Sequence, residues 1–204
     1  DSKRLMGMDH ISHQYPHCWR CKEPIVFRAT EQWFASLTEF RQDILDNIDQ
    51  VQWIPAWGRD RIYNMVQYRS YWCITRQRTW GVPIPIFYCE SCNKTIINDQ
   101  TISYLQKIFA EEGSQAWFAR TALELLPPGF VCPDCRSSEF TKETGTMDVW
   151  FDSGSSHMAV LESRPELRWP SDIYLEGSDQ HRGWFNSSIT TSVAVRGVAP
   201  YRAV

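Results

Sequence analysis

The sequence predicts an α/β fold with an inserted helical, metal-binding subdomain, and two features carry this prediction. The first is a junction at which a short apolar run, Asp172 to Leu175, stops at Gly177 and a helical pattern begins near Ser178. Open α/β sheets bind ligands at such places, outside the carboxyl ends of strands and against helix N-termini. The second feature is two Cys-x-x-Cys pairs that bracket helical stretches between residues 87 and 140. The junction therefore predicts a small-molecule site, and the cysteine pairs predict a metal site.

Composition and charge are those of an ordinary globular protein. The 204 residues are 43% hydrophobic and 22% charged with a net charge of −3, so the overall charge does not indicate nucleic-acid binding. No apolar run approaches the ~20 residues of a membrane span, and Asp1 to Gly7 is too polar for a secretory signal. Six of the seven cysteines lie in Cys-x-x-Cys pairs, which favours metal ligation over disulfides and therefore a reducing cytoplasm.

The first part of the chain is predicted to be mainly helical. Apolar residues from Glu31 to Val51 recur in steps of three and four, which predicts a helix that Trp53-Ile-Pro55 ends. A second helix is expected from Asp60 to about Arg69, followed by the β-rich run Tyr71 to Thr75.

The second part alternates helices with short strands. Helices are expected over Gln100 to Ala110 and Gln115 to Leu126, followed by a strand over Thr146 to Phe151 that runs into a turn at Asp152 to Gly154. After the strand Asp172 to Leu175, a helix should run from Ser178 to about Val195. The chain opens and stops without boundary signals, which suggests a piece of a longer protein. We expect four parts: residues 1–30, 31–86, 87–145 and 146–204.

Two of the cysteine pairs predict a complete zinc site. Cys89 and Cys92 form one knuckle and Cys132 and Cys135 form the other. Two such knuckles can complete a tetrahedron around Zn²⁺, and four thiolates leave no open position, so the site would be structural. Buried or accidental thiols are the alternative interpretation.

The third pair, Cys18 and Cys21, is half a site. His17 and His13 could complete it, but adjacent residues make poor ligand geometry, so we expect the partner knuckle outside this chain. A redox dithiol is the competing interpretation. Cys73 stands alone and is expected to be a buried structural cysteine.

Several strings resemble the isoleucyl-tRNA synthetases, a class I family. Tyr15-Pro-His-Cys-Trp-Arg-Cys21 with Phe27 to Phe34 is similar to the segment that returns from the editing insertion. The run from Trp72 to Pro85 resembles the family's Trp-Cys-Ile-Ser-Arg-Gln-Arg-x-Trp-Gly, with Thr75 in place of the usual Ser. Asp148 to His157 and Leu175 to Phe185 are the most specific matches, and the resemblance covers nearly the whole chain.

The resemblance implies the second half of a Rossmann-like nucleotide-binding domain. It implies an isoleucine–tRNA ligase that activates isoleucine with ATP and transfers it to tRNA(Ile), with structural Zn²⁺ as cofactor. Glu176 would contact the isoleucyl-adenylate, Gly177 would let the backbone approach it, and Asp179 and Gln180 would bind the ribose or the aminoacyl end. Trp184 and Trp150 would wall the isoleucine pocket.

Structural alternatives stand beside these roles. Ser178 or Asp179 could cap the helix, and Trp184 could belong to the core. Glu176 is harder to explain structurally, since an acid at a strand end is rarely buried without a partner. Arg76 and Arg78 could face tRNA phosphate or pair with acids inside the protein. No role is assigned to His157 or His181.

The chain lacks two family signatures and the editing site. Neither His-Ile-Gly-His nor Lys-Met-Ser-Lys-Ser occurs in it, so we expect that it cannot activate isoleucine alone. The longer protein from which this chain comes would be a monomer. A truncated sheet, in contrast, exposes an edge through which this chain could self-associate. The alternative function is a zinc-knuckle RNA-binding module without catalytic activity, in which Trp72, Trp80, Phe87 and Tyr88 stack bases.

Overall fold

The computed structural model describes residues 6–78 and 80–204, and the chain divides into two units, Asp1–Glu31 and Gln32–Val204. Residues 1–5 of the predicted return segment and Thr79 of the Trp72 to Pro85 run lie outside the described residues. Among the described residues, no helix is long and apolar enough to cross a membrane.

The first unit contains a tight turn around the cysteine pair Cys18 and Cys21. The N–H of Lys22 donates to Cys18 O at 2.8 Å, and the N–H of Cys18 donates to Glu23 O at 2.8 Å. Lys22 takes a φ of 63°, in the left-handed region, and an isolated antiparallel bridge joins His17 to Pro24. The turn is therefore held by its own backbone hydrogen bonds.

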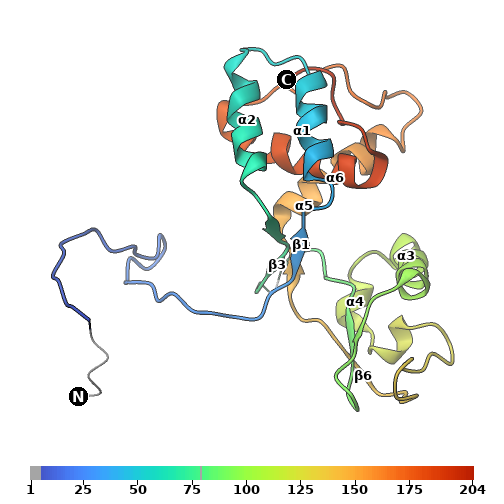
Figure 1. Cartoon of the computed structure of the whole chain (residues 1–204). Coiled ribbons are helices and arrows are strands. Elements are labelled where there is room, and N and C mark those ends of the chain that lie inside the picture. The colour runs from blue at the N-terminus through green and yellow to red at the C-terminus, as the bar shows by residue number, and fades with distance from the viewer. Residues whose placement is uncertain (1–5, 79) are drawn as a thin grey trace. The chain divides into compact units, whose positions relative to one another are not determined.

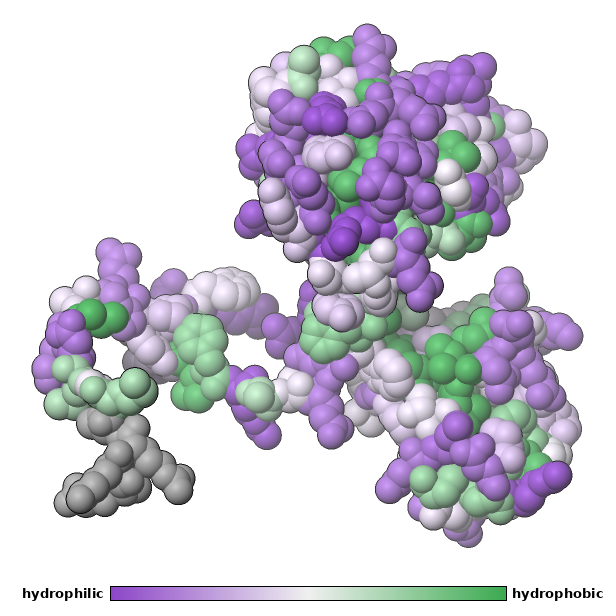
Figure 2. Space-filling model, viewed as in Figure 1, coloured by the Kyte–Doolittle hydropathy of each residue, from purple (hydrophilic) through white to green (hydrophobic). Residues whose placement is uncertain are grey.

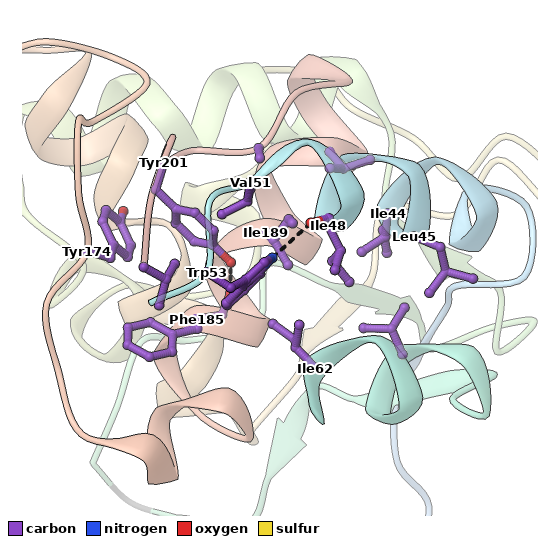
Figure 3. Close-up of a cluster of buried hydrophobic side chains, with 14 residues drawn as sticks. Ile44, Leu45, Ile48, Val51, Trp53, Ile62, Tyr174, Phe185, Ile189 and Tyr201 are labelled. Atoms are coloured by element: carbon purple, nitrogen blue, oxygen red, sulfur yellow. Dashed lines mark hydrogen bonds between the residues drawn. The ribbon is translucent and has the colours of Figure 1, made fainter. Parts of the chain in front are cut away.

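One hydrophobic core of the second unit lies in the part of it that carries four helices (Figure 1). Ile44, Ile48, Ile62 and Ile189 are completely buried in this core. Trp53 donates its indole N–H to Ile48 O at 2.9 Å, and Tyr201 donates its hydroxyl to Phe185 O at 2.9 Å (Figure 3). The helices are α1 (Arg41–Gln50), α2 (Trp57–Gln67), α5 (Val149–Gly154) and α6 (Trp184–Arg196), with shorter helical turns at His157–Leu161 (π) and Ser178–His181 (3-10).

Three extended segments beside this core lie parallel to one another. Isolated parallel bridges join Gln52 to Ala203 and Ser171 to Tyr201. Backbone hydrogen bonds extend the pairing: Ile54 N–H donates to Val204 O at 2.7 Å, and Tyr174 N–H donates to Ala203 O at 2.9 Å. The segment that ends at Val204 therefore lies between the other two. This is the parallel arrangement expected of an α/β sheet, although each segment pairs over only a few residues.

The part of the second unit that carries four cysteines has its own core (Figure 1). Phe87 and Trp117 pack in it with ring centroids 5.1 Å apart, and both are buried. Asn98 caps α3 (Asp99–Glu112) with a reciprocal pair of hydrogen bonds to Thr101. The elements are β4 (Phe87–Cys89), β5 (Thr95–Ile96), β6 (Phe140–Lys142), α3 (Asp99–Glu112), α4 (Ala116–Ala119) and the 3-10 turn Leu123–Leu125, and the strand order is β5-β4-β6.

Two small antiparallel sheets join segments that are distant in sequence. In one sheet, β1 (Phe34–Ser36) pairs with β2 (Tyr71–Cys73). In the other, β3 (Thr75–Arg76) pairs with β7 (Thr146–Met147). The visible surface around α1 and α2 is mostly hydrophilic, with scattered hydrophobic residues (Figure 2).

Two of the predicted elements change type in the structure. The predicted helix from Glu31 to Val51 is wrong over its first ten residues, because Phe34–Ser36 pairs with Tyr71–Cys73 as a strand and the helix begins only at Arg41. The predicted strand over Thr146 to Phe151 ends at Met147. Asp148 then caps a helix, and the expected turn at Asp152 to Gly154 is part of that helix.

Three other predictions need smaller corrections. Gln115 to Leu126 is two short turns, because Thr121 donates its N–H and hydroxyl to Glu124 and so starts a new turn. Asp172 to Leu175 is extended but is no regular strand, since its pairing among the described residues is limited to an isolated bridge at Ser171 and a hydrogen bond from Tyr174 N–H to Ala203 O. The helix after Ser178 is interrupted at Gly183, whose φ of −114° and ψ of −118° are not helical. The predictions for α2 and α3 are confirmed to within three residues.

Candidate ligand and metal sites

The predicted ligand loop follows the extended segment that ends near Tyr174. Glu176, Gly177 and Asp179 are exposed, and Gln180 is half-buried. Hydrogen bonds from Gln180 N–H to Gly177 O and from Arg182 N–H to Asp179 O, both 3.1 Å, hold the loop as a 3-10 turn. Glu176 is therefore exposed to solvent and not buried at the strand end, so its charge needs no partner inside the protein.

Short polar contacts order the side chains of this loop. Gln180 Oε1 accepts from Trp184 N–H at 2.9 Å and so caps the start of α6. Its Nε2 donates to Asp179 Oδ2 at 3.2 Å. A Cβ at Gly177 would lie 2.7 Å from Asp179 Oδ1, which explains the glycine by the close approach of that carboxylate. The φ of Gly177, −72°, is ordinary, so backbone strain plays no part.

The two predicted pocket tryptophans differ in exposure. Trp184 is half-buried: its ring stacks on Tyr174 with centroids 3.9 Å apart, and its indole N–H lies 3.0 Å from Ser153 O and 3.1 Å from Ser156 Oγ. Trp150 is 40% exposed. A Cβ at Gly183 would lie 2.7 Å from the Trp150 ring and 2.5 Å from Gln180 Oε1, so the structure brings Trp150 beside Gln180 at that glycine.

Four cysteines converge in the part of the chain that contains β4 and β6. Cys89 Sγ lies 3.4 Å from Cys135 Sγ, and Cys92 Sγ lies 3.6 Å from Cys132 Sγ. All four sulfurs lie within 4.8 Å of one another, and among the described residues no other group of three or more potential ligands does so. Four sulfurs around Zn²⁺ at 2.3 Å would be about 3.8 Å apart, so these distances fit a tetrahedral ion.

The backbone and the thiol chemistry of this cluster also fit a cation. Asn93 and Arg136, which follow the two pairs, have φ values of 54° and 64° and donate their N–H groups to Cys89 O and Cys132 O. Burial raises the pKa of Cys89, but N–H groups of Cys92 and Ser91 and the Cys135 thiol lower it to about 7 overall. The Lys94 N–H lowers the pKa of Cys92, but the neighbouring thiols outweigh it and raise that pKa to about 12. A cation among the sulfurs would allow all four to be thiolates.

The turn at Cys18 and Cys21 repeats the same backbone pattern. Its positive φ at Lys22 and its bond from Lys22 N–H to Cys18 O match those at Asn93 and Arg136. Backbone N–H groups of Cys21 and Arg20 lower the pKa of Cys18. Nδ1 of His17 lies 2.8 Å from Tyr15 O. The turn has the shape of a metal knuckle, and no third ligand joins it among the described residues.

Comparison with known proteins matches residues 14–204 to the family model "tRNA synthetases class I (I, L, M and V)". The chain belongs to the class I tRNA synthetases.

Relatives of this synthetase chain are isoleucine–tRNA ligases. That of Moorella thermoacetica is 70% identical over 200 residues, which are 98% of this chain and 22% of that protein. That of Caldicellulosiruptor bescii is 64% identical over 203 residues, which are 100% of this chain and 22% of that protein. The chain therefore spans about a fifth of the length of these relatives.

A solved structure resembles the synthetase chain more distantly. It is the ternary complex of the Agrobacterium radiobacter K84 LeuRS with tRNA and LeuAMS, at a TM-score of 0.41 and 20% identity. The match covers 66% of this chain and 18% of that one.

Sequence reasoning assigned no role to His181, which the structure places under the ligand loop. Its ring is buried between Trp53 and Trp57, with centroids 5.8 and 5.6 Å away, and its Nδ1 lies 2.8 Å from Ser178 O. A Cβ at Gly58 would lie 2.8 Å from its Nε2. His181 therefore ties the loop to α2, and no local sequence signal indicates this contact.

The remaining candidate residues are placed more simply. Arg76 pairs with Asp148 inside the protein, whereas Arg78 is exposed. Cys73 is half-buried, not buried as predicted, and its thiol donates to Gln32 Oε1 at 2.6 Å. Trp72 and Phe87 are buried, at 5% and 0% exposure, so these two aromatic residues of the alternative RNA-binding function are not available to stack bases, whereas Trp80 is exposed.

Proposed function

We propose that this chain is the second part of the catalytic domain of an isoleucine–tRNA ligase. The observation that carries the proposal is 70% identity to such a ligase over 98% of the chain. The longer protein would activate isoleucine with ATP to isoleucyl-adenylate and then transfer the isoleucyl group to tRNA(Ile). We place it in the cytoplasm, because paired free thiols persist in a reducing compartment.

The chain's contribution to this reaction is positioning. The carboxylate of isoleucine attacks the α-phosphate of ATP, and such a step is accelerated by orientation and by charge stabilisation. The exposed Glu176 and Asp179 are acceptors for hydroxyl and ammonium groups of the adenylate. Gly177, which has no Cβ, leaves room for the carboxylate of Asp179. The side chain of Gln180 is fixed by its hydrogen bond to Trp184 N–H.

The isoleucine side chain would lie against Trp150. The partial exposure of its indole supports this role, because it leaves apolar surface for a ligand. Trp184 would form the second wall from its stacked position on Tyr174. Pockets of this kind separate isoleucine from valine by only about 1–3 kcal/mol, which is why an editing site elsewhere in the protein is expected.

The four-cysteine cluster would hold a structural zinc ion. Cys89, Cys92, Cys132 and Cys135 supply four thiolates and no open position, so the ion would stabilise the inserted subdomain, residues 87–145. Cys18 and Cys21 would bind a second ion with a knuckle from another part of the longer protein. The pattern of hydrogen bonds that their turn shares with the other two knuckles supports this assignment.

The test is a chimera. This chain replaces the matching segment of the Moorella thermoacetica isoleucine–tRNA ligase, and isoleucine-dependent exchange of pyrophosphate into ATP is measured. Exchange within about tenfold of the unmodified ligase is expected, and Asp179→Ala in the chimera should lower it by about 10²-fold. Val149→Ala, on the exposed surface of α5, is the control. A folded chimera without exchange would refute the proposal.

A further inference from the structure

The ligand loop runs between two buried residues. Tyr174 and His181 are both 5% exposed, whereas residues 175–180 between them are exposed or half-buried. Two of the residues in between, Glu176 and Asp179, carry the side chains that the proposed function turns toward the adenylate. The positions of these side chains therefore depend on how firmly the chain is held at Tyr174 and at His181.

The two ends of the loop are held in different ways. At the first end, Tyr174 N–H donates to Ala203 O at 2.9 Å, so the parallel pairing of the backbone fixes the start of the loop. The other end is the 3-10 turn Ser178–His181, and such short turns have poorer hydrogen-bond geometry than α-helices. The side chain of His181 joins this weaker end to α2.

Three aromatic rings surround the imidazole of His181. The rings of Trp53 and Trp57 lie 5.8 and 5.6 Å from it, centroid to centroid, and Phe185 meets it edge-on at 5.4 Å. Trp53 and Phe185 belong to the hydrophobic core of α1, α2 and α6 (Figure 3). Aromatic pairs attract one another at these distances, so the imidazole has little freedom to rotate or shift.

Gly58 lets the imidazole approach the backbone of α2. A Cβ at this position would lie 2.8 Å from His181 Nε2 and 3.3 Å from the Trp53 ring. Real Cβ atoms do not come within 3.0 Å of other heavy atoms, and a ring between two tryptophans cannot move away as a flexible side chain could. The contact between α2 and the ligand loop therefore requires a glycine at position 58.

The hydrogen bond of His181 decides which ring nitrogen carries the proton. Nδ1 lies 2.8 Å from Ser178 O, and a carbonyl oxygen can only accept, so Nδ1 donates. Nε2 is buried and has no hydrogen-bond partner among the described residues. A proton on Nε2 would create a buried cation whose N–H has no acceptor, which is unfavourable. The ring is therefore the neutral tautomer with its proton on Nδ1.

We propose that His181 is a positioning residue for adenylate formation, an inference that rests on the proposed function. Through its Nδ1–H bond to Ser178 O, the buried ring holds Asp179 and Gln180 where they meet the adenylate, and it does not touch the substrate itself. Displacement of a binding group by about 1 Å can lower a rate by about 10²-fold. This role explains why a polar ring and not an apolar side chain lies among the three aromatic rings.

The test compares two amide variants of His181 in the chimera described above. In His181→Asn, the amide nitrogen is as far from Cα along the side chain as Nδ1 is, so it can still donate to Ser178 O. In His181→Gln, the amide nitrogen is one bond further out, where Nε2 lies, and the bond to Ser178 O is lost. Both variants lose the aromatic contacts, so a purely structural role would lower activity in both alike.

The measurement is kcat for isoleucine-dependent exchange of pyrophosphate into ATP. His181→Asn should keep kcat within about threefold of the unmodified chimera, whereas His181→Gln should lower it about tenfold. Circular dichroism and urea unfolding establish that both variants are folded under the assay conditions. Equal losses of kcat in the two variants, or full activity of His181→Gln, would overturn the inference.

Gly58→Ala tests the same contact from α2, because it displaces the imidazole and changes no residue of the loop. The kcat for pyrophosphate exchange should fall about tenfold, and adding His181→Gln should lower it by less than a further twofold, since both changes break one contact. Gln67→Ala, at the exposed end of α2, is the matched control and should stay within about twofold of the unmodified chimera. Fully additive losses in the double variant would show that Gly58 does not act through His181.

Two measurements on the 204-residue chain do not depend on the chimera. Nitrogen-15 spectra should show one histidine ring, missing from His181→Asn, with a proton on Nδ1 and none on Nε2 at neutral pH. In His181→Gln, the backbone N–H groups of Gln180 and Arg182 should exchange with solvent at least about tenfold faster. A proton on Nε2, or unchanged solvent exchange, would overturn the inference. A chimera without pyrophosphate exchange in any form would refute the proposed function, whereas these measurements would still decide whether His181 holds the loop.

Discussion

The buried carboxylate of Asp148 lies 2.8 Å from the guanidinium of Arg76, more than seventy positions earlier in the chain. The same carboxylate accepts from the indole of Trp72, and the N–H of Asp148 donates to Ile74 O at 2.7 Å. Asp148 also caps α5. Asp148 thus connects the β2–β3 segment to α5, the helix that carries Trp150.

Loss of this carboxylate should destabilise the second unit. Asp148→Ala leaves Arg76 and the Trp72 indole without their acceptor, and about 2–3 kcal/mol of unfolding free energy should be lost because Asp148 is buried. Urea unfolding measures it. Asp172→Ala, which breaks the exposed pair with Arg168, should cost less than about 1 kcal/mol. Equal costs would mean that the Asp148 pair is not structural.

Zinc per chain can be measured by elemental analysis of protein purified under reducing conditions. About one zinc is expected, bound by the four clustered cysteines, and Cys132→Ser should reduce it to near zero. Cys18→Ser, in the knuckle that lacks partners, should leave the content unchanged. About two ions per chain would mean that Cys18 and Cys21 find ligands within the chain or across a dimer. Folded protein with free thiols and no zinc would contradict the metal assignment.

Contact between α5 and α6 depends on Gly154. A Cβ there would lie 2.9 Å from backbone atoms of Ser187, and backbone cannot yield as a flexible side chain can. Gly154→Ala should therefore separate the two helices and cost about 1–3 kcal/mol by thermal or urea unfolding. Ser163→Ala, at an exposed position beyond α5, is the control and should be near neutral. A Gly154→Ala protein as stable as the parent would show that the helices can separate without cost.

Stability should depend on the protonation of His157. Burial lowers the pKa of this fully buried histidine below its ordinary value of 6.5, although Glu162 acts to raise it. Because the unfolded chain binds the proton more readily, stability is fully present above pH 6.5 and is lost as the pH falls toward the folded-state pKa. Urea unfolding at pH 7.5 and 5.5 should give a smaller difference for His157→Gln than for the parent. His13→Gln, at an exposed histidine, should keep the parental difference.

The open edge of the parallel segments should promote self-association. Ile173 and Leu175 are 52% and 83% exposed beside Tyr174, and an uncovered apolar edge pairs readily with another chain. Light scattering should show dimers or larger species that Ile173→Lys reduces. Val149→Lys, which adds the same charge at an exposed residue of α5, should leave the distribution unchanged. A monomeric parent chain would show that this edge is protected.

Sequence reasoning identified the elements whose signal is local. The helices α2 and α3 follow from apolar periodicity, and the cysteine turns follow from cysteine spacing, because each depends on residues within one or two turns. The helix predicted over Glu31 to Val51 failed at Phe34–Ser36 for the opposite reason. Its apolar spacing suits a helix, but hydrogen bonds to Tyr71–Cys73 decide its conformation.

The sequence alone determined the family of this protein and predicted the grouping of its four cysteines, because both depend on short runs of residue types. The tertiary structure decided the pairing of Asp148 with Arg76 and the burial of His181 between two tryptophans. These contacts join side chains from segments far apart in the chain. Their energies depend on distance and burial in the folded state, which no local pattern encodes.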